Sequence, residues 1–544
     1  MSVAELSQAR PPGHAFALAR LRLPRWSAAA WGAIALVCAF VALTWWWLTQ
    51  DRGVPGTEPG VALAASLVSR DMLHAGDLLG PLTLNEIHPP LIRTVGALGM
   101  LIGGIDPISP VIAENLLFVP LLALGCYQTA KLAAGPRAGL LAVVFALGAP
   151  LMTEQFHVLM LDAPQAALVA LVCWLVLASD RFRRLGLAAL AGAAVGAGAE
   201  VKQQFAVYVA GLLAVVLLRG GWRNWRGVAV FAAAALVVCA PWYVAHLGEL
   251  SQYNDASVAG ATPGTLPDRL SLGNVTWYLW GALNGWLYAP LFAIAAIGLA
   301  TAGLTTARRL RAGGAAPARA RTPGSADVMP ALLAGALVSW VGLMATPIHV
   351  VRYLLPMTVY VAVPATVWIV RLRPRAQALA TAALVLAALT GVACSLGFGQ
   401  PTRVTFGATE ADRSIYGVRL ANQVVLYAPR AFQLAGPERE GDMLGLLRTL
   451  HRHGVQTVAW LREDESPYVF DRYGLSALIW MARLVVLNRY DPAHLPEGTA
   501  LLVRGARFGT TPPCLRLADG SGVWVRFGSA RSPQGASWCP DRRS

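Results

Sequence analysis

Charged residues are scarce in this 544-residue sequence, and lysine is almost absent. Only 13% of the residues are charged, and the only lysines are Lys131 and Lys202. Soluble domains carry about 25% charged residues, so the composition argues against an ordinary soluble protein. The net charge of +15 comes from arginines in short clusters between apolar runs. The positive-inside bias of membrane proteins explains such clusters, and we therefore predict no nucleic-acid partner.

Metal-binding cysteine and histidine motifs are also missing. Five of the seven cysteines lie within apolar runs, and no CxxC pair or histidine-rich spacing is present, so a structural zinc site is not expected. The other two, Cys514 and Cys539, lie in a polar tail. They would form a disulfide if that tail faces an oxidising compartment; the alternative is a pair of free thiols.

Apolar residues, in contrast, are abundant. They make up 56% of the sequence, and the mean hydropathy is +0.53. Several apolar runs approach the ~20 residues needed to cross ~30 Å of hydrocarbon. We predict a polytopic α-helical membrane protein with about 11–13 transmembrane helices. The expected spans are 27–49, 110–130, 138–152, 163–179, 185–200, 204–218, 227–246, 277–303, 328–346, 351–370 and 376–397.

The arginine clusters predict the topology. Residues 1–26 and the basic clusters between spans are expected in the cytoplasm, and the transmembrane domain is expected to cover 27–397. The alternation requires that the apolar stretch 91–105 does not form a single crossing. Residues 398–544 have mixed polarity and predict an external α/β domain. Its expected elements are a helix over 440–454, strands over 455–461 and 499–503, and a hairpin over 515–527.

Ionisable side chains collect at the predicted outer ends of the spans. Such groups are costly at membrane depth and are functional candidates by default, so the set favours a polar cavity that opens outward. Three plainer interpretations stay open: wetted interfacial residues, an N-cap role for Asp162, and an interfacial anchor formed by Arg352 and Tyr353. The set comprises Asp51, Glu58, Glu86 and His88 in the first loop (51–91), followed by Glu154, His157, Asp162, Glu200, Lys202, His349 and Arg352.

These groups suggest a chemistry. A carboxylate can act as a general base, and Lys202, Arg352 and either His88 or His349 can hold a phosphate. Together with a membrane, they favour transfer from a lipid-linked phosphate donor. The same groups would suit a transporter, so local motifs have to decide.

Four local motifs carry a family resemblance. The sequence resembles the GT-C glycosyltransferases of the dolichyl-phosphate-mannose protein mannosyltransferase type, including the bacterial aminoarabinose transferase-like enzymes, over about residues 30–370. The motifs are Thr57-Glu58 followed by Ser69-Arg70-Asp71-Met72, Ala75-Gly76-Asp77 and His88-Pro89-Pro90-Leu91; Gly135-Pro136-Arg137-Ala138-Gly139-Leu140-Leu141-Ala142 leading to Leu161-Asp162-Ala163-Pro164; Gly196-Ala197-Gly198 with Glu200-Val201-Lys202-Gln203; and Arg352-Tyr353-Leu354-Leu355-Pro356.

The resemblance implies an inverting transferase that uses a sugar on a polyprenyl phosphate. The base would be Glu58 or Asp51, because Thr57 stands where the family usually has the first acid of a pair. Lys202 and Arg352 would face the donor phosphate, and His88 would orient the loop or help to bind the donor. The remaining substrate-binding candidates are Tyr353, His349, Asp162 and Glu86.

The expected setting is the periplasmic face of a bacterial inner membrane, with a lipid, a cell-envelope glycan or a protein as acceptor. Acidic residues near a phosphate would hold Mg²⁺ or Mn²⁺, yet the cations already present would replace a metal equally well. One rival function is a secondary transporter or lipid flippase, which places ionisable groups near the bilayer midplane on broken helices. The other is a catalytically silent scaffold of the same fold, which the missing acid at Thr57 keeps open.

Overall fold

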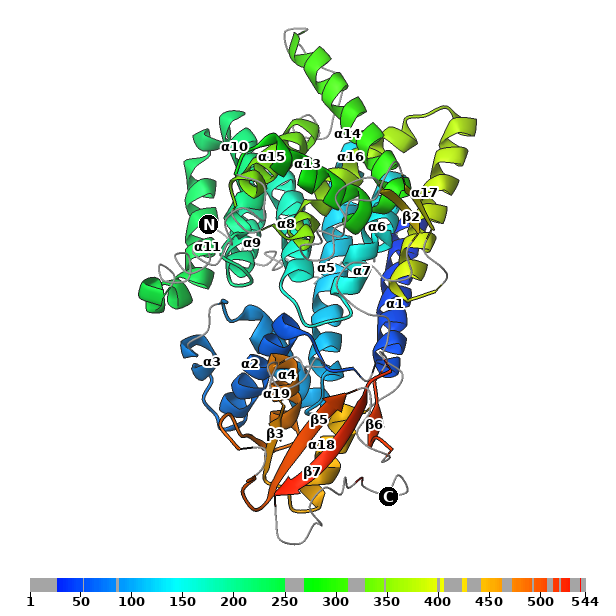
Figure 1. Cartoon of the computed structure of the whole chain (residues 1–544). Helices are drawn as coiled ribbons and strands as arrows, with labels where there is room; N and C mark the ends of the chain where they lie inside the picture. The colour runs from blue at the N-terminus through cyan, green and yellow to red at the C-terminus, as the bar shows by residue number, and fades with distance from the viewer. Residues whose placement is uncertain are drawn as a thin grey trace, which may run out of the picture.

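The structure is a computed structural model, and most of the residues that it describes are helical (Figure 1). Within this described part, seven helices are long and apolar enough to cross a membrane, and five shorter apolar helices accompany them. The predicted fold class, a polytopic helical membrane protein with a C-terminal α/β region, is confirmed. The described residues are 27–51, 53–84, 88–249, 269–311, 328–346, 349–398, 402–405, 423–427, 442–461, 472–491, 494–505, 512–517, 520–528 and 539.

Each predicted span corresponds to a helix or to a helix with a break. The long ones are α1 (Ala28–Gln50), α5 (Ile108–Ala134), α11 (Trp225–Ala245), α14 (Tyr288–Arg311), α15 (Val328–Ala345), the unit made of η3 (Val351–Met357) and α16 (Thr358–Val370), and α17 (Pro374–Ser395). The shorter ones are α4 (Leu91–Gly103), α6 (Pro136–Gly148), α8 (Asp162–Ala178), α9 (Leu185–Ala199) and α10 (Phe205–Leu218). Between them lie α2 (Thr57–His74), α3 (Gly80–Thr83), α7 (Pro150–Gln155), η1 (Gly221–Arg223), α13 (Leu272–Gly281) and η2 (Ala282–Trp286).

The predicted span 138–152 is interrupted, and a proline is the reason. Helix α6 ends before Ala149, whose ψ of 122° is extended, and α7 begins at Pro150. The residue before a proline avoids the helical region of backbone space. The chain therefore changes direction at Ala149 instead of continuing as one helix.

Helix α4 corresponds to the stretch 91–105, which the predicted topology requires not to form a single crossing. Its 13 residues extend about 20 Å at 1.5 Å per residue, which is less than the ~30 Å of hydrocarbon. A Cβ at Gly99 would meet the backbone of Ser109 and Pro110, so α4 packs closely on the start of α5. Helix α4 is too short to cross alone and stays beside α2 (Figure 1).

The C-terminal region contains a five-stranded sheet with the order β4-β3-β5-β7-β6. β3 runs parallel to β4 and β5, whereas β7 is antiparallel to β5 and β6. Val523 and Val525 on β7 are fully buried in its core. The strands are β3 (Thr457–Trp460), β4 (Val485–Val486), β5 (Thr499–Gly505), β6 (Leu515–Arg516) and β7 (Gly522–Gly528); a separate antiparallel pair is formed by β1 (Thr402–Thr405) and β2 (Gln423–Tyr427).

Two helices accompany this sheet. Asp442 caps α18 (Met443–Arg452) by accepting a hydrogen bond from the Gly445 N–H, and α19 (Arg472–Met481) packs against α2 of the first loop. Figure 1 shows the sheet, α2 and α4 at one end of the molecule, with α14 projecting from the other end. The first loop and the C-terminal region therefore form one assembly.

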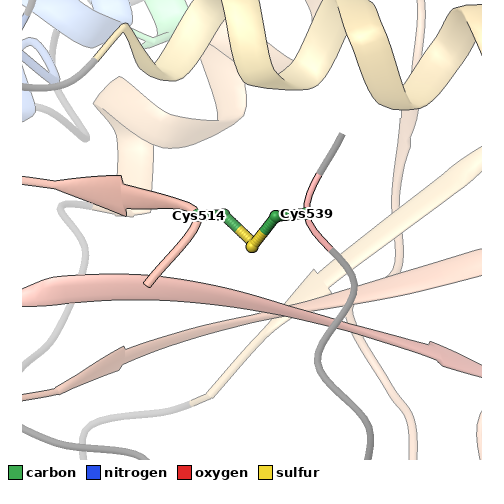
Figure 2. The surroundings of a disulfide bond; sticks show 2 residues. All are labelled: Cys514 and Cys539. Atoms are coloured by element: carbon green, nitrogen blue, oxygen red, sulfur yellow. A yellow bond between two sulfur atoms is a disulfide. The ribbon is translucent and has the colours of Figure 1, made fainter. Parts of the chain in front are cut away.

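The structure decides between a disulfide and free thiols for the two cysteines of the C-terminal tail. Cys514 and Cys539 form a disulfide, with their Cα atoms 4.9 Å apart (Figure 2). The bond attaches residue 539 to the start of β6.

Candidate active site

Four charged side chains from distant parts of the chain meet in one group, here called the charged cluster: Glu58, Asp162, Lys202 and Arg352. Lys202 Nζ lies 2.7 Å from Asp162 Oδ1, and Arg352 Nε lies 2.9 Å from Asp162 Oδ2. Arg352 Nη2 donates to both carboxylate oxygens of Glu58, at 2.5 Å from Oε1. The two carboxylates balance the two cations, so the cluster is formally neutral.

Every member of the charged cluster stands at a helix end or in a break. Glu58 lies in the first turn of α2, and Asp162 is the first residue of α8, where the helix dipole favours a negative charge. Lys202 occupies the turn between α9 and α10. Arg352 lies in η3, the 3₁₀ segment that precedes α16. Helix ends converge here, and they bring the four groups together.

Tyr353 and Tyr208 support the cationic side of the cluster. Lys202 Nζ lies 4.2 Å from the centroid of the Tyr353 ring, which is a cation–π contact. Tyr208 Oη donates a 2.8 Å hydrogen bond to the Tyr353 carbonyl oxygen. Asp162, Lys202 and Arg352 are all buried. Because removing one partner of a buried ion pair leaves an uncompensated charge, the cluster behaves as a unit.

Two of the plainer interpretations are wrong. Asp162 is not an N-cap, because Leu161 holds that position and the Asp162 carboxylate pairs with cations instead. Arg352 and Tyr353 do not form an interfacial anchor, because only 7% and 8% of their surfaces are exposed. Their burial follows from the packing of η3 against α8.

His88 lies next to the charged cluster and is fixed through the backbone. Arg93 donates a 3.2 Å hydrogen bond from Nη1 to the His88 carbonyl oxygen. The Leu91 N–H, three residues on, donates to the Glu200 carbonyl oxygen at 3.1 Å, which ties the first loop to the turn that carries Lys202. Burial, and after it the charge of Lys202, lowers the pKa of His88 to about 4. The imidazole is therefore neutral at neutral pH.

A cavity of about 250 Å³ opens beside Glu58. We call it the Glu58 cavity. Its wall combines α2, the start of α4 with the segment before it, the segment before α8, and one residue of α19 in the C-terminal region. Lys202 and Arg352 are not among its lining residues, which are Thr57, Glu58, Val61, Ala62, His88, Pro89, Ile92, Arg93, Met160, Leu161 and Tyr473.

Asp51, the other candidate base, lines a different cavity of about 360 Å³. We call it the Asp51 cavity. It lies between the end of α1, the start of α5 and the C-terminal helices α18 and α19. Asp51 Oδ1 accepts a 3.1 Å hydrogen bond from the Gly53 N–H. His157 lines the same cavity and stacks on Trp47, with ring centroids 4.0 Å apart.

The structure does not bring every predicted residue into the charged cluster. His349 Nε2 lies 2.7 Å from Asn274 Oδ1, and its ring stacks with Tyr278 and meets Trp277 edge-on. It thus belongs to a buried aromatic group built on α13. Glu86 lies outside the described residues.

Two residues at the site were missed. Arg93 lies inside the apolar stretch 91–105, and the cost of a charge at membrane depth would have identified it. Tyr473 has no such signal, because only the packing of α19 on α2 places it in the Glu58 cavity.

The two alternatives for metal use, a bound Mg²⁺ or Mn²⁺ and its replacement by the cationic side chains, both stay open. Across the described ranges, no three side chains of His, Cys, Asp or Glu are grouped as ligands of one ion. In the charged cluster, both carboxylates already contact cationic side chains.

Comparison with known families supports the resemblance. A family model described as "Dolichyl-phosphate-mannose-protein mannosyltransferase" matches residues 87–244, which confirms the resemblance predicted from the motifs. The matched segment contains His88, Asp162 and Lys202. Glu58 and Arg352 lie outside it, on either side, and the ion pairs described above connect them to it.

Several solved structures are similar to this chain. ArnT from Cupriavidus metallidurans bound to undecaprenyl phosphate shares 18% identity, with a TM-score of 0.47, and the match covers 68% of this chain and 71% of that one. The apo state of the same protein shares 20% identity, with a TM-score of 0.45, and the match covers 68% of this chain and 71% of that one. The apo oligosaccharyltransferase of Archaeoglobus fulgidus shares 10% identity, with a TM-score of 0.43, and the match covers 84% of this chain and 64% of that one. A search of curated protein sequences finds no match.

Proposed function

We propose that this protein is an inverting membrane glycosyltransferase that transfers a sugar from a polyprenyl-phosphate donor. The observation that carries the proposal is the charged cluster, in which Glu58 meets the cations Lys202 and Arg352 around the buried Asp162. A base beside a pair of cations is the arrangement that displacement of a phosphate requires. The glycosyltransferase match over 87–244 supports the same conclusion.

The reaction is a single displacement. Glu58 accepts the proton of an acceptor hydroxyl, and the hydroxyl oxygen attacks the anomeric carbon of the donor sugar. The bond between that carbon and the phosphate oxygen breaks, and its electron pair leaves with the polyprenyl phosphate. Attack opposite to the leaving group inverts the anomeric configuration.

The cations stabilise the leaving group. Lys202 and Arg352 sit in a buried site, where electrostatic attraction is stronger than in water. Asp162 keeps both of them charged and in place. An incoming phosphate competes with Glu58 for Arg352, whose guanidinium has five N–H donors. His88 is neutral, so it offers a hydrogen bond without adding charge beside Lys202.

The proposed setting is a bacterial inner membrane with the N-terminus in the cytoplasm. The first loop and the C-terminal region would then face the periplasm, in accord with the arginine clusters between the predicted spans and with the Cys514–Cys539 disulfide. A lipid, a cell-envelope glycan or a protein would accept the sugar.

The test is sugar transfer by the purified full-length protein in lipid vesicles. The donors are radiolabelled glucose, mannose, galactose and aminoarabinose on undecaprenyl phosphate, and membrane extract supplies acceptors. The two lysines provide a matched pair, because Lys131 also lies over a tyrosine, 5.8 Å from the Tyr127 ring centroid. We expect Lys202→Met to lower transfer by about 10²–10³-fold and Lys131→Met to leave it unchanged. Absence of transfer from every donor, or equal activity of the two variants, contradicts the proposal.

A further inference from the structure

The Glu58 cavity has one wall that comes from outside the membrane part of the chain. Tyr473, the second residue of α19, lines it opposite residues of the first loop. Its side chain is 48% exposed. The Arg472 guanidinium carbon lies 5.8 Å from the centroid of this ring. A partly exposed aromatic residue that lines the same cavity as the proposed base is suited to contact a substrate.

The position of Tyr473 relative to Glu58 is set by the closest approach of α19 to α2. A Cβ at Gly474 would overlap the Pro55 carbonyl oxygen, and a Cβ at Gly60 would overlap the backbone of Gly474. Only glycine at both positions allows this contact. Glu58 precedes Gly60 by two residues, and Tyr473 directly precedes Gly474, so the backbone contact fixes both side chains near one point.

The cations on the two sides of Glu58 have different partners. On one side the Glu58 carboxylate accepts hydrogen bonds from Arg352, which belongs to the proposed phosphate site. On the other side lies the Glu58 cavity, which Arg93 lines but Lys202 and Arg352 do not. The Arg93 guanidinium donates to the carbonyl oxygens of Pro81, Leu84 and His88. If the donor phosphate occupies the cationic side, the cavity remains for the acceptor, and Glu58 lies between the two reactants as a base must.

We propose that the Glu58 cavity binds a sugar ring of the acceptor and that Tyr473 is the residue on which this ring stacks. The volume of about 250 Å³ is near the lower limit of ligand pockets, roughly 300 Å³, which suits one sugar ring. Arg93 and His88 supply polar contacts at the cavity wall. The acceptor is then a glycan or a glycolipid, and the C-terminal region completes its site. The assignment rests on the proposed function, because Glu58 acts here as the base.

The test measures binding of two kinds of probe to full-length protein in lipid nanodiscs, which avoid sugar-based detergents. Methyl glycosides of glucose, mannose and galactose, followed by saturation-transfer NMR, report on the Glu58 cavity. Undecaprenyl phosphate reports on the charged cluster. The variants are Tyr473→Ala, Tyr473→Phe and Trp480→Ala; Trp480 is an exposed aromatic residue of the same helix that does not line the cavity.

We expect at least one glycoside to bind the wild type, and Tyr473→Ala to raise its Kd by about 2–10-fold, the worth of one aromatic contact. Tyr473→Phe keeps the ring and should bind like the wild type, as should Trp480→Ala. No variant should change the Kd for undecaprenyl phosphate.

The assignment is overturned if no glycoside binds the wild type, or if Tyr473→Ala binds as tightly as Trp480→Ala. Failure of the wild type to bind undecaprenyl phosphate, with Tyr473-dependent glycoside binding intact, overturns the proposed donor and supports the sugar cavity. The two proposals therefore fail separately.

Discussion

The first turn of α2 lies between two cavities. The two cavities are lined by similar kinds of residue, but their acidic side chains have different bonding partners. Each has an acid of the first loop, a histidine and a wall from the C-terminal region; His157 is buried, whereas His88 is partly buried. In the Glu58 cavity these are Glu58, His88 and Tyr473. In the Asp51 cavity they are Asp51, His157 and residues of α18 and α19. Gly56, Pro59 and Leu63 of the α2 region face the Asp51 cavity, whereas Thr57, Glu58, Val61 and Ala62 face the Glu58 cavity.

The difference lies in what surrounds each acid. Glu58 is bonded to Arg352 and, through Asp162, linked to Lys202. The Asp51 carboxylate accepts a backbone N–H two residues away, a local turn contact. The ion pair with Arg352, and the link through Asp162 to Lys202, are therefore what favours Glu58 over Asp51 as the proposed base.

The largest expected effect tests this distinction directly. Glu58→Gln removes the proposed base and should lower kcat for sugar transfer by about 10²–10⁴-fold, the usual contribution of a general base. Asp51→Asn should stay within about twofold of the wild type, because substitutions away from the site change free energies by about 0.5 kcal/mol. Initial rates in reconstituted vesicles, with thermal unfolding as the check on folding, measure both.

The reverse pattern would exchange the roles of the two cavities. If Asp51→Asn abolishes transfer and Glu58→Gln does not, the base lies in the Asp51 cavity, and the Glu58–Arg352 pair is structural. If both variants are fully active, neither acid is the base.

The sequence predicted the elements of this site better than their pairing. Apolar runs identified the spans, and the cost of a charge at membrane depth identified Asp162, Lys202 and Arg352. Which acid faces the cations depends on how η3 packs against α8 and on the contact of Arg352 with Glu58, and no local pattern encodes a contact across 294 residues. The same limit explains His349, whose partner Asn274 is 75 residues away, and Tyr473, which reaches the site only through α19.

The second test uses the two histidines. Burial and the charge of Lys202 lower the pKa of His88 to about 4, and burial lowers the pKa of His157 to about 3. Unfolded histidine titrates near about 6.5, so below that pH the unfolded chain binds more protons and the native state loses stability. The contribution of His88 is complete above about pH 6.5 and is lost as the pH falls through 4.

Replacing His88 by Gln should therefore reduce the acid-induced loss of stability between pH 7 and pH 4 by about 3 kcal/mol, measured by unfolding at each pH. His157→Gln should also reduce the acid-induced loss of stability between pH 7 and pH 4. The groups that face His88 are Lys202, Asp162, Arg352 and Arg93, and so only His88→Gln should also change the Kd for undecaprenyl phosphate. If His88→Gln and His157→Gln have the same Kd for undecaprenyl phosphate, the result contradicts the assignment of the donor phosphate to the His88 side.

The smallest expected effects concern two contacts of the C-terminal region, one with the first loop and one with the segment between α4 and α5. Stability and the acceptor KM distinguish them. Gly474→Ala places a Cβ against the Pro55 carbonyl oxygen and should cost about 1–3 kcal/mol, as overpacking does. It should also raise the acceptor KM, because it displaces α19 from the Glu58 cavity. Arg448→Ala removes a hydrogen bond from Nη2 to the Ile105 carbonyl oxygen beside the Asp51 cavity and should cost about 1 kcal/mol with no change in KM.

Gly186→Ala, where nothing lies within 4 Å of the added Cβ, is the control for a glycine replaced without a clash. If Gly474→Ala lowers stability and leaves the KM unchanged, α19 supports the fold without shaping the acceptor site.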